Sequence, residues 1–254
     1  MANADNVFRV FIGYDDRQAV SYTTLQHSIL ETSSGPVSVT PLILSTLPIT
    51  RRGLTPFTFS RFLVPWLCNY EGHALFLDAD MFLVSDICEM IQYFNDDHAI
   101  SVVRSIAQFE QSSVMLFNNA HPKNIQLTPD FIQHTEENLH GLCWLEGEDI
   151  GEMDGKWNQL VGYQECRGSS GNLHFTMGVP AFPETSTSDF GQLWTDCAKR
   201  AIGVTKTWGE IMGPSVHSVQ INGHYFPKYV WDNDSLSVKS PHQKLVSSLL
   251  NGSQ

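Results

Sequence analysis

The stretch His73-Ala-Leu-Phe-Leu-Asp78-Ala-Asp80-Met-Phe-Leu-Val-Ser-Asp86-Ile decides how this chain is interpreted. Residues 74–77 form a short apolar run, typical of a strand buried on both faces, and a second apolar run at 81–84 follows the two acids. Carboxylates inside so apolar a segment are costly to desolvate unless a positive charge neutralises them. Because side chains alternate along an extended chain, Asp78 and Asp80 are expected to point the same way.

Two interpretations of this acidic pair remain open on spacing alone. Two carboxylates that converge on one point suit Mg²⁺ or Mn²⁺, and such an ion in turn suits phosphate oxygens. The alternative is a strand end followed by two solvated turn aspartates, because Asp-x-Asp also arises by chance. The apolar flanks strengthen the case for a metal site until the two interpretations are about equal.

The composition indicates an acidic globular protein. The chain has 254 residues, 42% hydrophobic and 17% charged, enough for a sizeable core in one α/β domain or two small ones. Its 15 Lys and Arg against 27 Asp and Glu give a formal charge of −12. This balance argues against nucleic-acid and anionic-membrane partners, which need basic patches. A phosphate-bearing ligand would therefore need a metal ion or a few local cations.

The cysteines and the first residues give no sign of secretion. Five scattered cysteines form no Cys-x-x-Cys motif, which predicts free thiols in a reducing compartment: Cys68, Cys88, Cys143, Cys166 and Cys197. A basic segment followed by an apolar one is missing at the start, so no signal peptide is predicted. No apolar run approaches the length of a membrane span. We therefore expect no membrane span and a cytoplasmic location.

Strands alternate with helices through the first half of the chain. Hydrophobic patterns predict strands at 7–12, 37–44, 74–77, 98–103, 112–118, 173–176 and 216–221. They predict helices at 18–30, 57–68, 85–94, 129–139 and 188–202, with Thr128 as the N-cap of the fourth. This order indicates an α/β fold with a single Rossmann-like, mostly parallel sheet and helices on both faces. Neither G-x-G-x-x-G nor a Walker lysine loop is present, so a dinucleotide site and a P-loop are not supported.

Several segments in register resemble the nucleotide-sugar-dependent glycosyltransferases of the GT-A fold. They are Val10-Phe-Ile-Gly-Tyr-Asp15, Phe57-Thr-Phe-Ser-Arg-Phe-Leu-Val-Pro65, Ala74-Leu-Phe-Leu-Asp-Ala-Asp80, Ser113-Val-Met-Leu-Phe-Asn118, Lys156-Trp-Asn-Gln-Leu-Val-Gly162 and His174-Phe-Thr-Met-Gly-Val-Pro180. The chain is most similar to the glycogenin-like and lipopolysaccharide galactosyltransferase-like group, and especially to small stand-alone glycosyltransferases of bacteria and their phages. The resemblance implies an enzyme in a bacterial or phage-infected cytoplasm.

The resemblance also implies a donor site for a UDP-sugar. Asp78 and Asp80 would be ligands of Mn²⁺ or Mg²⁺, and His174 would be a third ligand from a later strand. Arg61 would lie beside the donor phosphates. The nucleotide would contact Ile12, Gly13, Tyr14, Asp15 and Ala79, with Tyr14 stacked on the base, Asp15 at the uracil edge and Ala79 near the ribose. By residue type alone, a lone histidine is more often a hydrogen-bonded core group, and an arginine pairs equally with any acid.

The implied reaction is hexose transfer with retention of the anomeric configuration. A divalent ion, helped by Arg61, would neutralise charge that builds on the leaving diphosphate in an oxocarbenium-like transition state. Gln111, Ser112 and Asn158 occupy segments where the family contacts the transferred sugar. Trp157 either shapes the sugar or acceptor pocket or packs in the core.

The chain departs from the better-known relatives at two places. Pro180 stands near the position of a lysine, for which Lys206 or the Arg51-Arg52 loop would substitute. Lys156-Trp157-Asn158 stands where those relatives have Asp-Gln-Asp. The residue nearest the reacting carbon is therefore not assigned.

The leading hypothesis is a metal-dependent transferase that uses UDP-glucose or UDP-galactose and an unidentified carbohydrate or other hydroxyl acceptor. Its alternatives are a sugar-phosphate nucleotidyltransferase and a non-catalytic nucleotide-sugar-binding module. The chain 1–254 is expected to be a single domain, with 7–119 as the nucleotide-binding half and 120–254 as the acceptor half and C-terminal tail. Aromatic residues of that tail would cover the site, form a homodimer surface or pack in a core: Trp194, Trp208, Tyr225, Tyr229 and Trp231.

Overall fold

The structure is a computed structural model and describes residues 7–104, 108–163, 170–203, 218–221, 224–227, 230–232 and 235–239. The chain divides into two compact units, Met1–Ala201 and Ile202–Gln254. All residues of the predicted site belong to the first unit. Four residues that the sequence singles out lie outside the described residues: Cys166, Lys206, Trp208 and Tyr229. That the chain forms one domain over 1–254 stays a prediction.

The second unit contains two pairs of short antiparallel strands. β10 (Ser218–Ile221) pairs with β11 (His224–Pro227), and β12 (Val230–Asp232) pairs with β13 (Ser235–Lys239). Only the first of these strands is predicted from the sequence.

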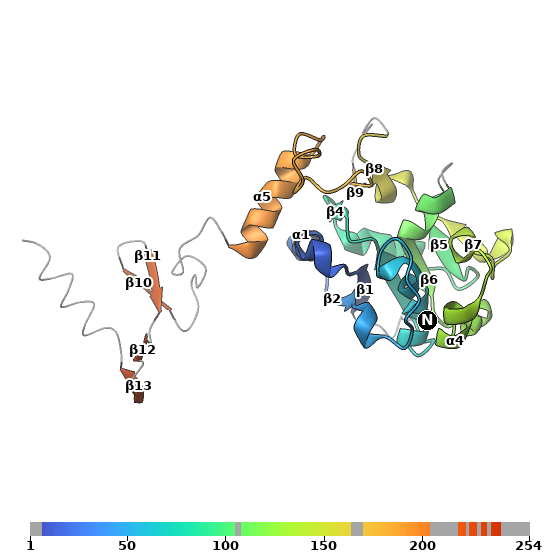
Figure 1. Ribbon diagram of the computed structural model, residues 1–254, viewed down its shortest axis with the longest axis horizontal. Coiled ribbons are helices and arrows are strands. Elements are labelled where there is room, and N and C mark those ends of the chain that lie inside the picture. The colour runs from blue at the N-terminus through green and yellow to red at the C-terminus, as the bar shows by residue number, and fades with distance from the viewer. Residues whose placement is uncertain are drawn as a thin grey trace, which may run out of the picture. The chain divides into compact units, whose positions relative to one another are not determined.

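The first unit is built on a six-stranded sheet in the order β2-β1-β3-β6-β5-β7 (Figure 1). The strands are β1 (Phe8–Gly13), β2 (Val37–Leu42), β3 (His73–Leu77), β5 (Ile100–Val102), β6 (Val114–Asn118) and β7 (Ile150–Glu152). β1 runs parallel to both β2 and β3, and β5 runs parallel to β7. β6 is antiparallel to its neighbours β3 and β5. The predicted α/β class with a mainly parallel sheet is confirmed.

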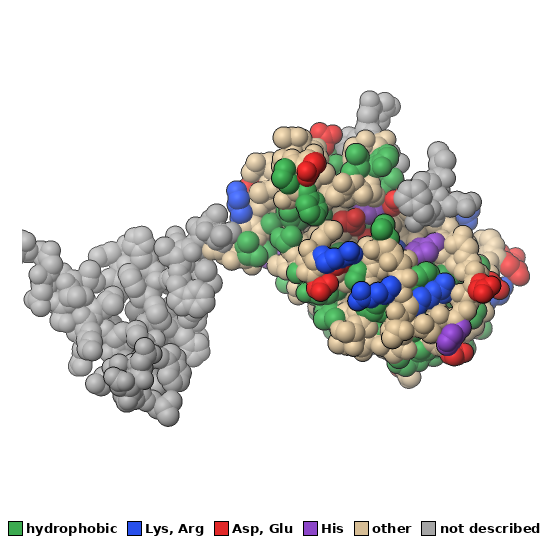
Figure 2. All heavy atoms as spheres, viewed as in Figure 1, with side chains coloured by type: hydrophobic (Ala, Val, Ile, Leu, Met, Phe, Trp, Pro, Cys, Tyr) green, Lys and Arg blue, Asp and Glu red, His purple; other side chains and the backbone are tan. Residues whose placement is uncertain are grey.

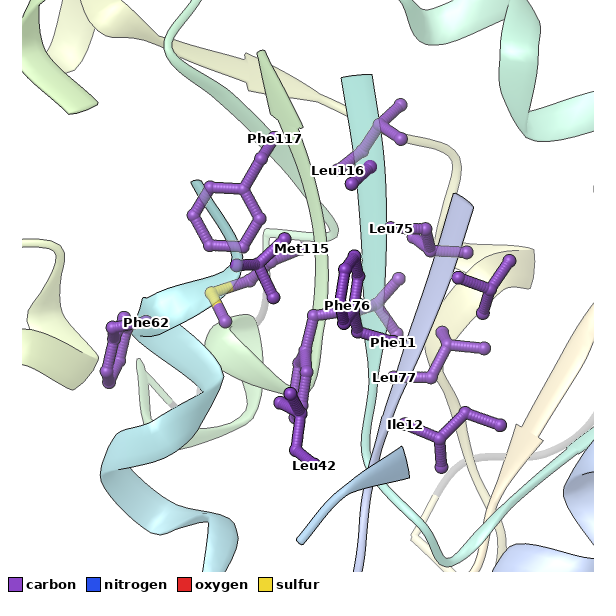
Figure 3. Packing of buried hydrophobic residues seen from close by; sticks show 14 of the residues in the cluster. Phe11, Ile12, Leu42, Phe62, Leu75, Phe76, Leu77, Met115, Leu116 and Phe117 are labelled. Atoms are coloured by element: carbon purple, nitrogen blue, oxygen red, sulfur yellow. The ribbon is translucent and has the colours of Figure 1, made fainter. Parts of the chain in front are cut away.

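Helices cover both faces of this sheet because its central strands are apolar on both sides. Phe76 and Met115 point towards Phe62 on one side, whereas Leu75 and Leu77 point to the other (Figure 3). The first side is covered by a continuous helical path of α2 (Phe57–Ser60), the 3₁₀ helix η3 (Arg61–Leu63) and α3 (Val64–Leu67). The other side is covered by α1 (Ala19–Thr32).

A second, three-stranded sheet has the order β4-β9-β8. It consists of β4 (Met81–Leu83), β8 (Gln159–Leu160) and β9 (Asn172–His174). α5 (Gly191–Ile202) packs over it in a separate apolar cluster that includes Trp194 and Leu173. The buried position of Trp194 favours core packing over a cover or a dimer surface for this residue of the tail.

Because β3 belongs to the six-stranded sheet and β4 to the three-stranded one, the turn between them joins the two sheets. This turn contains both acids of the predicted metal site.

Three predicted helices differ from the structure: that at 188–202 begins at Gly191, that at 129–139 ends early, and that at 85–94 is a 3₁₀ helix. α4 (Pro129–His134) begins as predicted, with the Thr128 hydroxyl accepting a hydrogen bond from the Phe131 amide at 3.2 Å. It ends five residues before the predicted end because the chain turns extended at Thr135, and Asn138 then caps a separate 3₁₀ helix. The predicted helix at 85–94 is the 3₁₀ helix η4 (Ile87–Tyr93), which Asp86 caps.

Other short helices connect these elements. They are η1 (Asp16–Gln18), η2 (Leu44–Thr46), η5 (Gln108–Ser113), η6 (Pro122–Gln126), η7 (Leu139–Gly141), η8 (Gly147–Asp149) and η9 (Gly155–Asn158). Each is a single turn or little more, as is common for 3₁₀ helices.

The face of the described part that Figure 2 shows carries side chains of both charges. In Figure 2, Lys and Arg side chains lie close to Asp and Glu side chains, with hydrophobic side chains scattered among them. None of the helices in the described ranges has the length and apolarity needed to span a bilayer. Four cysteines lie within these ranges, and none of them is in a disulfide: Cys68, Cys88, Cys143 and Cys197.

Two leucines of α1 provide a matched test of the core. Leu25 is 0% exposed, whereas Leu30 on the same helix is 56% exposed. We expect Leu25→Ala to lower the free energy of unfolding by about 2–5 kcal/mol, because it removes buried apolar surface and leaves a cavity. Leu30→Ala should change it by less than about 0.5 kcal/mol. Urea denaturation measures both, and equal losses would contradict this placement of α1.

Candidate active site

The two acids and the histidine converge at the junction of the two sheets. Asp78 follows β3 directly, Asp80 lies in the turn before β4, and Met81 is paired with His174 across β4 and β9. The ligand atoms of Asp78, Asp80 and His174 all lie within 4.8 Å of one another. The predicted convergence is thus present, but its cause is a turn and not an extended chain. The turn is held by backbone hydrogen bonds from Asp78 to Ser113 and from Phe175 to Asp80, of 3.0 and 2.9 Å.

His174 is buried between acidic groups. Its side chain is 3% exposed, with Nε2 3.3 Å from Oδ1 of Asp80 and Nδ1 3.4 Å from Oε2 of Glu110. Burial alone would lower the pKa of His174, but the carboxylates of Asp80, Asp78 and Glu110 outweigh it and raise that pKa above its usual value. The acidic groups around His174 thus favour positive charge at this place, whether on the imidazole itself or on a bound cation.

Asp78 is held by Arg61. The guanidinium Nη2 lies 2.9 Å from Oδ1 of Asp78, and Nη1 donates to Oδ2 at 3.3 Å. The contact at Oδ1 is an ion pair without hydrogen-bond geometry, so this oxygen keeps a lone pair free. Burial, reinforced by neighbouring Asp80, raises the pKa of Asp78 although Arg61 and His174 oppose the shift.

This donor set fits a divalent cation. Among the described residues, Asp78 pairs with Arg61, and Asp80 and Glu110 lie beside the two ring nitrogens of His174, so three carboxyl groups share a small site. Two carboxylates and an imidazole are ligands that Mn²⁺ accepts, and the free lone pair on Asp78 is available to it. Asp80 is the more accessible acid, with 33% of its side chain exposed.

A second group of metal-ligating side chains does not fit as well. His27 and Glu31 on α1 and Cys197 on α5 have ligand atoms within 4.8 Å of one another. However, Arg200 binds both oxygens of Glu31, at 2.9 and 2.7 Å, and so supplies the positive charge there. Burial raises the pKa of Cys197 to about 11, which disfavours a thiolate. We interpret this group as a contact that fixes α5 to α1.

A cavity of about 510 Å³ adjoins the acidic turn. Its wall is formed by Asp15, Gln18, Ser21, Thr55, Phe57, Ala79, Asp80, Thr176, Met177, Gly178, Phe182, Glu184 and Thr185. Of the predicted nucleotide contacts, Asp15 and Ala79 therefore line the cavity. A second hollow of about 310 Å³ shares Met177, Gly178, Glu184 and Thr185 with the first.

The other predicted nucleotide-contact residues of this strand and loop, Ile12, Gly13 and Tyr14, are not part of the cavity wall. Ile12 is completely buried in β1. A Cβ on Gly13 would lie 2.4 Å from the Phe57 ring, so glycine is needed for the close approach of β1 to this cavity wall. Tyr14 is half-buried and packs edge-on against Tyr22, with ring centroids 5.6 Å apart.

Asp15 has a partner that the sequence does not suggest. Both of its oxygens bind Arg17, with Nη2 2.6 Å from Oδ2 and Nε 2.9 Å from Oδ1. The hydrogen bond from Arg17 holds the pKa of Asp15 below its usual value. A base that bonds to Asp15 would have to share it with Arg17.

Ser112 holds the guanidinium of Arg61 through its backbone carbonyl. The Ser112 carbonyl accepts from Nη1 of Arg61 at 2.9 Å, and its fully buried hydroxyl lies 2.8 Å from Nδ1 of His140. Burial lowers the pKa of His140 to about 4, and the charges of Arg61 and Arg51 contribute. Gln111 is half-buried in η5, next to Ser112.

Asn158 and Trp157 lie beneath the site. Asn158 is buried and its Oδ1 lies 2.8 Å from Nδ1 of His174. Trp157 has no exposed surface, and a Cβ on Gly171 would lie 2.9 Å from its ring. Of the two roles predicted for Trp157, this geometry favours core packing.

Sequence reasoning missed Glu110, His140 and Arg17. Glu110 lies a few residues before the buried strand β6. An acidic residue just before a buried strand is the only feature of the sequence that could have suggested Glu110 as part of the site. Nothing in the sequence connects His140 to Ser112. Arg51, suggested as a substitute for the family's lysine, instead donates to the Ile132 carbonyl at 2.8 Å and stacks on Phe59.

Comparisons with known proteins agree with this architecture. No protein-family model matches the chain. The chain is 34% identical over 220 residues to protein CDI of Arabidopsis thaliana, a match that covers 74% of this chain and 84% of that protein.

Solved structures with a similar fold are glycosyltransferases. The bifunctional glycosyltransferase WbbM superposes with a TM-score of 0.61 at 13% sequence identity. The match covers 76% of this chain and 50% of the WbbM chain. GlyE of Streptococcus pneumoniae gives 0.55 at 18% identity, with 75% and 60% covered. The galactosyltransferase LgtC, solved with donor and acceptor sugar analogues, gives 0.54 at 11% identity, with 81% and 99% covered. The chain thus spans half of WbbM and 60% of GlyE. At these identities the likeness shows the GT-A-type fold, as the sequence predicts.

The depressed pKa of His140 predicts a pH-dependent contribution to stability. This pKa is about 4 in the folded chain against an ordinary 6.5, so the unfolded chain binds the proton more readily. Neutral, buried His140 therefore makes its full contribution to the free energy of unfolding above about pH 6.5. This contribution is lost as the pH falls from about 6.5 to about 4. In urea titrations, the stability gap between the wild type and His140→Gln should narrow between about pH 7.5 and about pH 5. A gap that stays constant would contradict a neutral buried His140.

Proposed function

Because the chain belongs to the family of Arabidopsis thaliana protein CDI and has a GT-A-type fold, we propose that it is a metal-dependent glycosyltransferase. It transfers a hexose from a UDP-sugar, UDP-glucose or UDP-galactose, to a carbohydrate or other hydroxyl acceptor. The observation that carries this proposal is the group Asp78, Asp80 and His174 at the edge of a cavity of about 510 Å³. In open α/β sheets, ligands bind beyond the carboxyl ends of the strands, and Asp78 follows the end of β3.

Breaking the bond between sugar and diphosphate places negative charge on the leaving phosphate. A bound Mn²⁺ or Mg²⁺ supplies a Lewis acid that stabilises this charge. Asp78 and Asp80 would hold the ion through carboxylate oxygens, and His174 would do so through Nε2, the nitrogen that faces Asp80. Arg61 fixes Asp78 through the ion pair of 2.9 Å and adds positive charge to a site of low dielectric.

The nucleotide would occupy the cavity next to this group. Phe57 presents an aromatic ring there, and Asp15 and Gln18 offer groups that pair with a base edge. Ala79 lies at the wall between the two acids, where a larger side chain would occupy the space of the ribose. The second hollow shares a wall with the first, which makes it a suitable entrance for a hydroxyl acceptor. Retention rests on the resemblance to retaining transferases, and a homodimer stays a prediction.

The nucleotidyltransferase alternative has less support. That class needs cations in the loop after the first strand to bind the triphosphate, and the loop of this chain offers Arg17. Its guanidinium is engaged with Asp15 and with the Leu54 carbonyl. The proposed location is the cytoplasm, where cysteines stay reduced, as the four cysteines of the described ranges are.

A thermal-shift measurement tests donor binding. We expect UDP with Mn²⁺ to raise the melting temperature by several degrees, since ligand at about 100 times its Kd adds about 2.7 kcal/mol of stability. UDP alone should raise it much less, because the acids repel the diphosphate without the ion. Stabilisation by ATP or a sugar phosphate, with no effect of UDP and Mn²⁺, would instead favour the nucleotidyltransferase.

A pair of matched substitutions tests the metal site. Asp80→Asn should reduce Mn²⁺-dependent hydrolysis of the UDP-sugar by at least about 100-fold, because it removes a charged ligand where negative charge develops. Asp96→Asn is the control, since the Asp96 side chain is 97% exposed. Both variants should unfold at nearly the wild-type temperature. Equal activity of the two variants would remove Asp80 from the mechanism.

A further inference from the structure

Asn158 is placed to act on the metal site through His174. Its side chain is buried, with 4% of the residue exposed, so no sugar can reach it without rearrangement. It ends η9 and lies next to β8, whose Leu160 is paired with His174 of β9. The position places the amide on the side of the imidazole that faces away from Asp80.

Hydrogen bonding determines the orientation of the Asn158 amide. The Glu110 backbone carbonyl lies 3.0 Å from Nδ2 of Asn158, and a carbonyl can only accept. The nitrogen of the amide must therefore face Glu110. Its oxygen, Oδ1, must then face Nδ1 of His174, 2.8 Å away.

This orientation in turn determines which nitrogen of His174 carries hydrogen. An amide oxygen can only accept, so Nδ1 must be the donor. The Glu110 carboxylate, 3.4 Å from Nδ1, is a second acceptor on the same side. Nε2 is then the nitrogen whose lone pair can be offered to a cation, and it is the nitrogen that faces Asp80 at 3.3 Å.

We propose that Asn158 is a positioning residue, which holds His174 in the Nδ1–H form and aims Nε2 at the divalent cation. This inference rests on the proposed function, and it gives Asn158 a different role from the sugar contact expected from the sequence. Glu110 assists by fixing the amide through its backbone and by lying beside Nδ1. Partners of this kind raise the basicity of a ligating histidine, and their loss typically costs about 10–100-fold in metal affinity.

The test measures Mn²⁺ binding directly, by electron paramagnetic resonance titration of the free ion with purified protein. Asn158→Leu is nearly isosteric and removes the acceptor, and we expect its dissociation constant for Mn²⁺ to rise about 10–100-fold. Asn158→Asp keeps an acceptor for Nδ1 and should stay within a few-fold of wild type. Asn124→Leu is the control, because Asn124 is fully buried and uses both ends of its amide far along the sheet, at Ala99 and Trp144.

Turnover at saturating Mn²⁺ separates this role from a sugar contact. A residue that acts through His174 should leave kcat of Asn158→Leu near wild type once the metal site is filled, with KM for the UDP-sugar unchanged. A contact to the sugar would lower kcat or raise that KM at every Mn²⁺ concentration, with unchanged Mn²⁺ affinity, and would overturn the inference. Equal weakening of Mn²⁺ binding in Asn158→Leu and Asn124→Leu would also overturn it, as a general effect on the fold. No Mn²⁺ binding by the wild type would instead refute the proposed function.

Discussion

Arg61 holds Asp78 through an ion pair of 2.9 Å, while Asp80 and Glu110 flank His174 beside it. Burying carboxylates in a medium of low dielectric is unfavourable unless the charge is neutralised. One guanidinium does not balance Asp78, Asp80 and Glu110, and His174 is drawn towards protonation as a result. A divalent cation at this place would remove the imbalance and would in turn attract a diphosphate. The same excess of charge therefore connects the stability of the site with the chemistry proposed for it.

The two sheets make this arrangement geometrically possible. The six-stranded sheet ends β3 at Leu77, and the chain enters the three-stranded sheet at Met81, so the acids lie in the short turn between two rigid layers. His174 is added from β9 by its pairing with Met81, and Asn158 is added behind it from η9. These side chains are thus positioned by backbone pairing, by the Arg61 ion pair or by a buried hydrogen bond, so a bound cation would require little rearrangement. Such preorganisation is what a site for a developing anion needs.

The sequence predicts most of this fold, because central strands that are buried on both faces leave continuous apolar runs such as 74–77 and 114–118. It also predicts the convergence of Asp78, Asp80 and His174, but for the wrong reason. The prediction assumes an extended chain at 78–80, whereas in the structure the two acids meet in a turn. The end of α4 was beyond prediction, since the extended conformation of Thr135 depends on the cap that follows it. Glu110 and the role of Asn158 were beyond prediction for a different reason. Both depend on which segments of the chain lie against each other. A single sequence does not show that the side chains of Asn158 and His174 are hydrogen-bonded.

The central claim is that Asp78, Asp80 and His174 bind one divalent cation that also carries a diphosphate. Anomalous diffraction from a crystal grown with UDP and Mn²⁺ tests it most directly. The account predicts a single manganese peak about 2.0–2.3 Å from a carboxylate oxygen of Asp78 or Asp80 and from Nε2 of His174, with diphosphate oxygens completing the coordination. A manganese peak elsewhere, or UDP bound with no manganese at these three side chains, would contradict it.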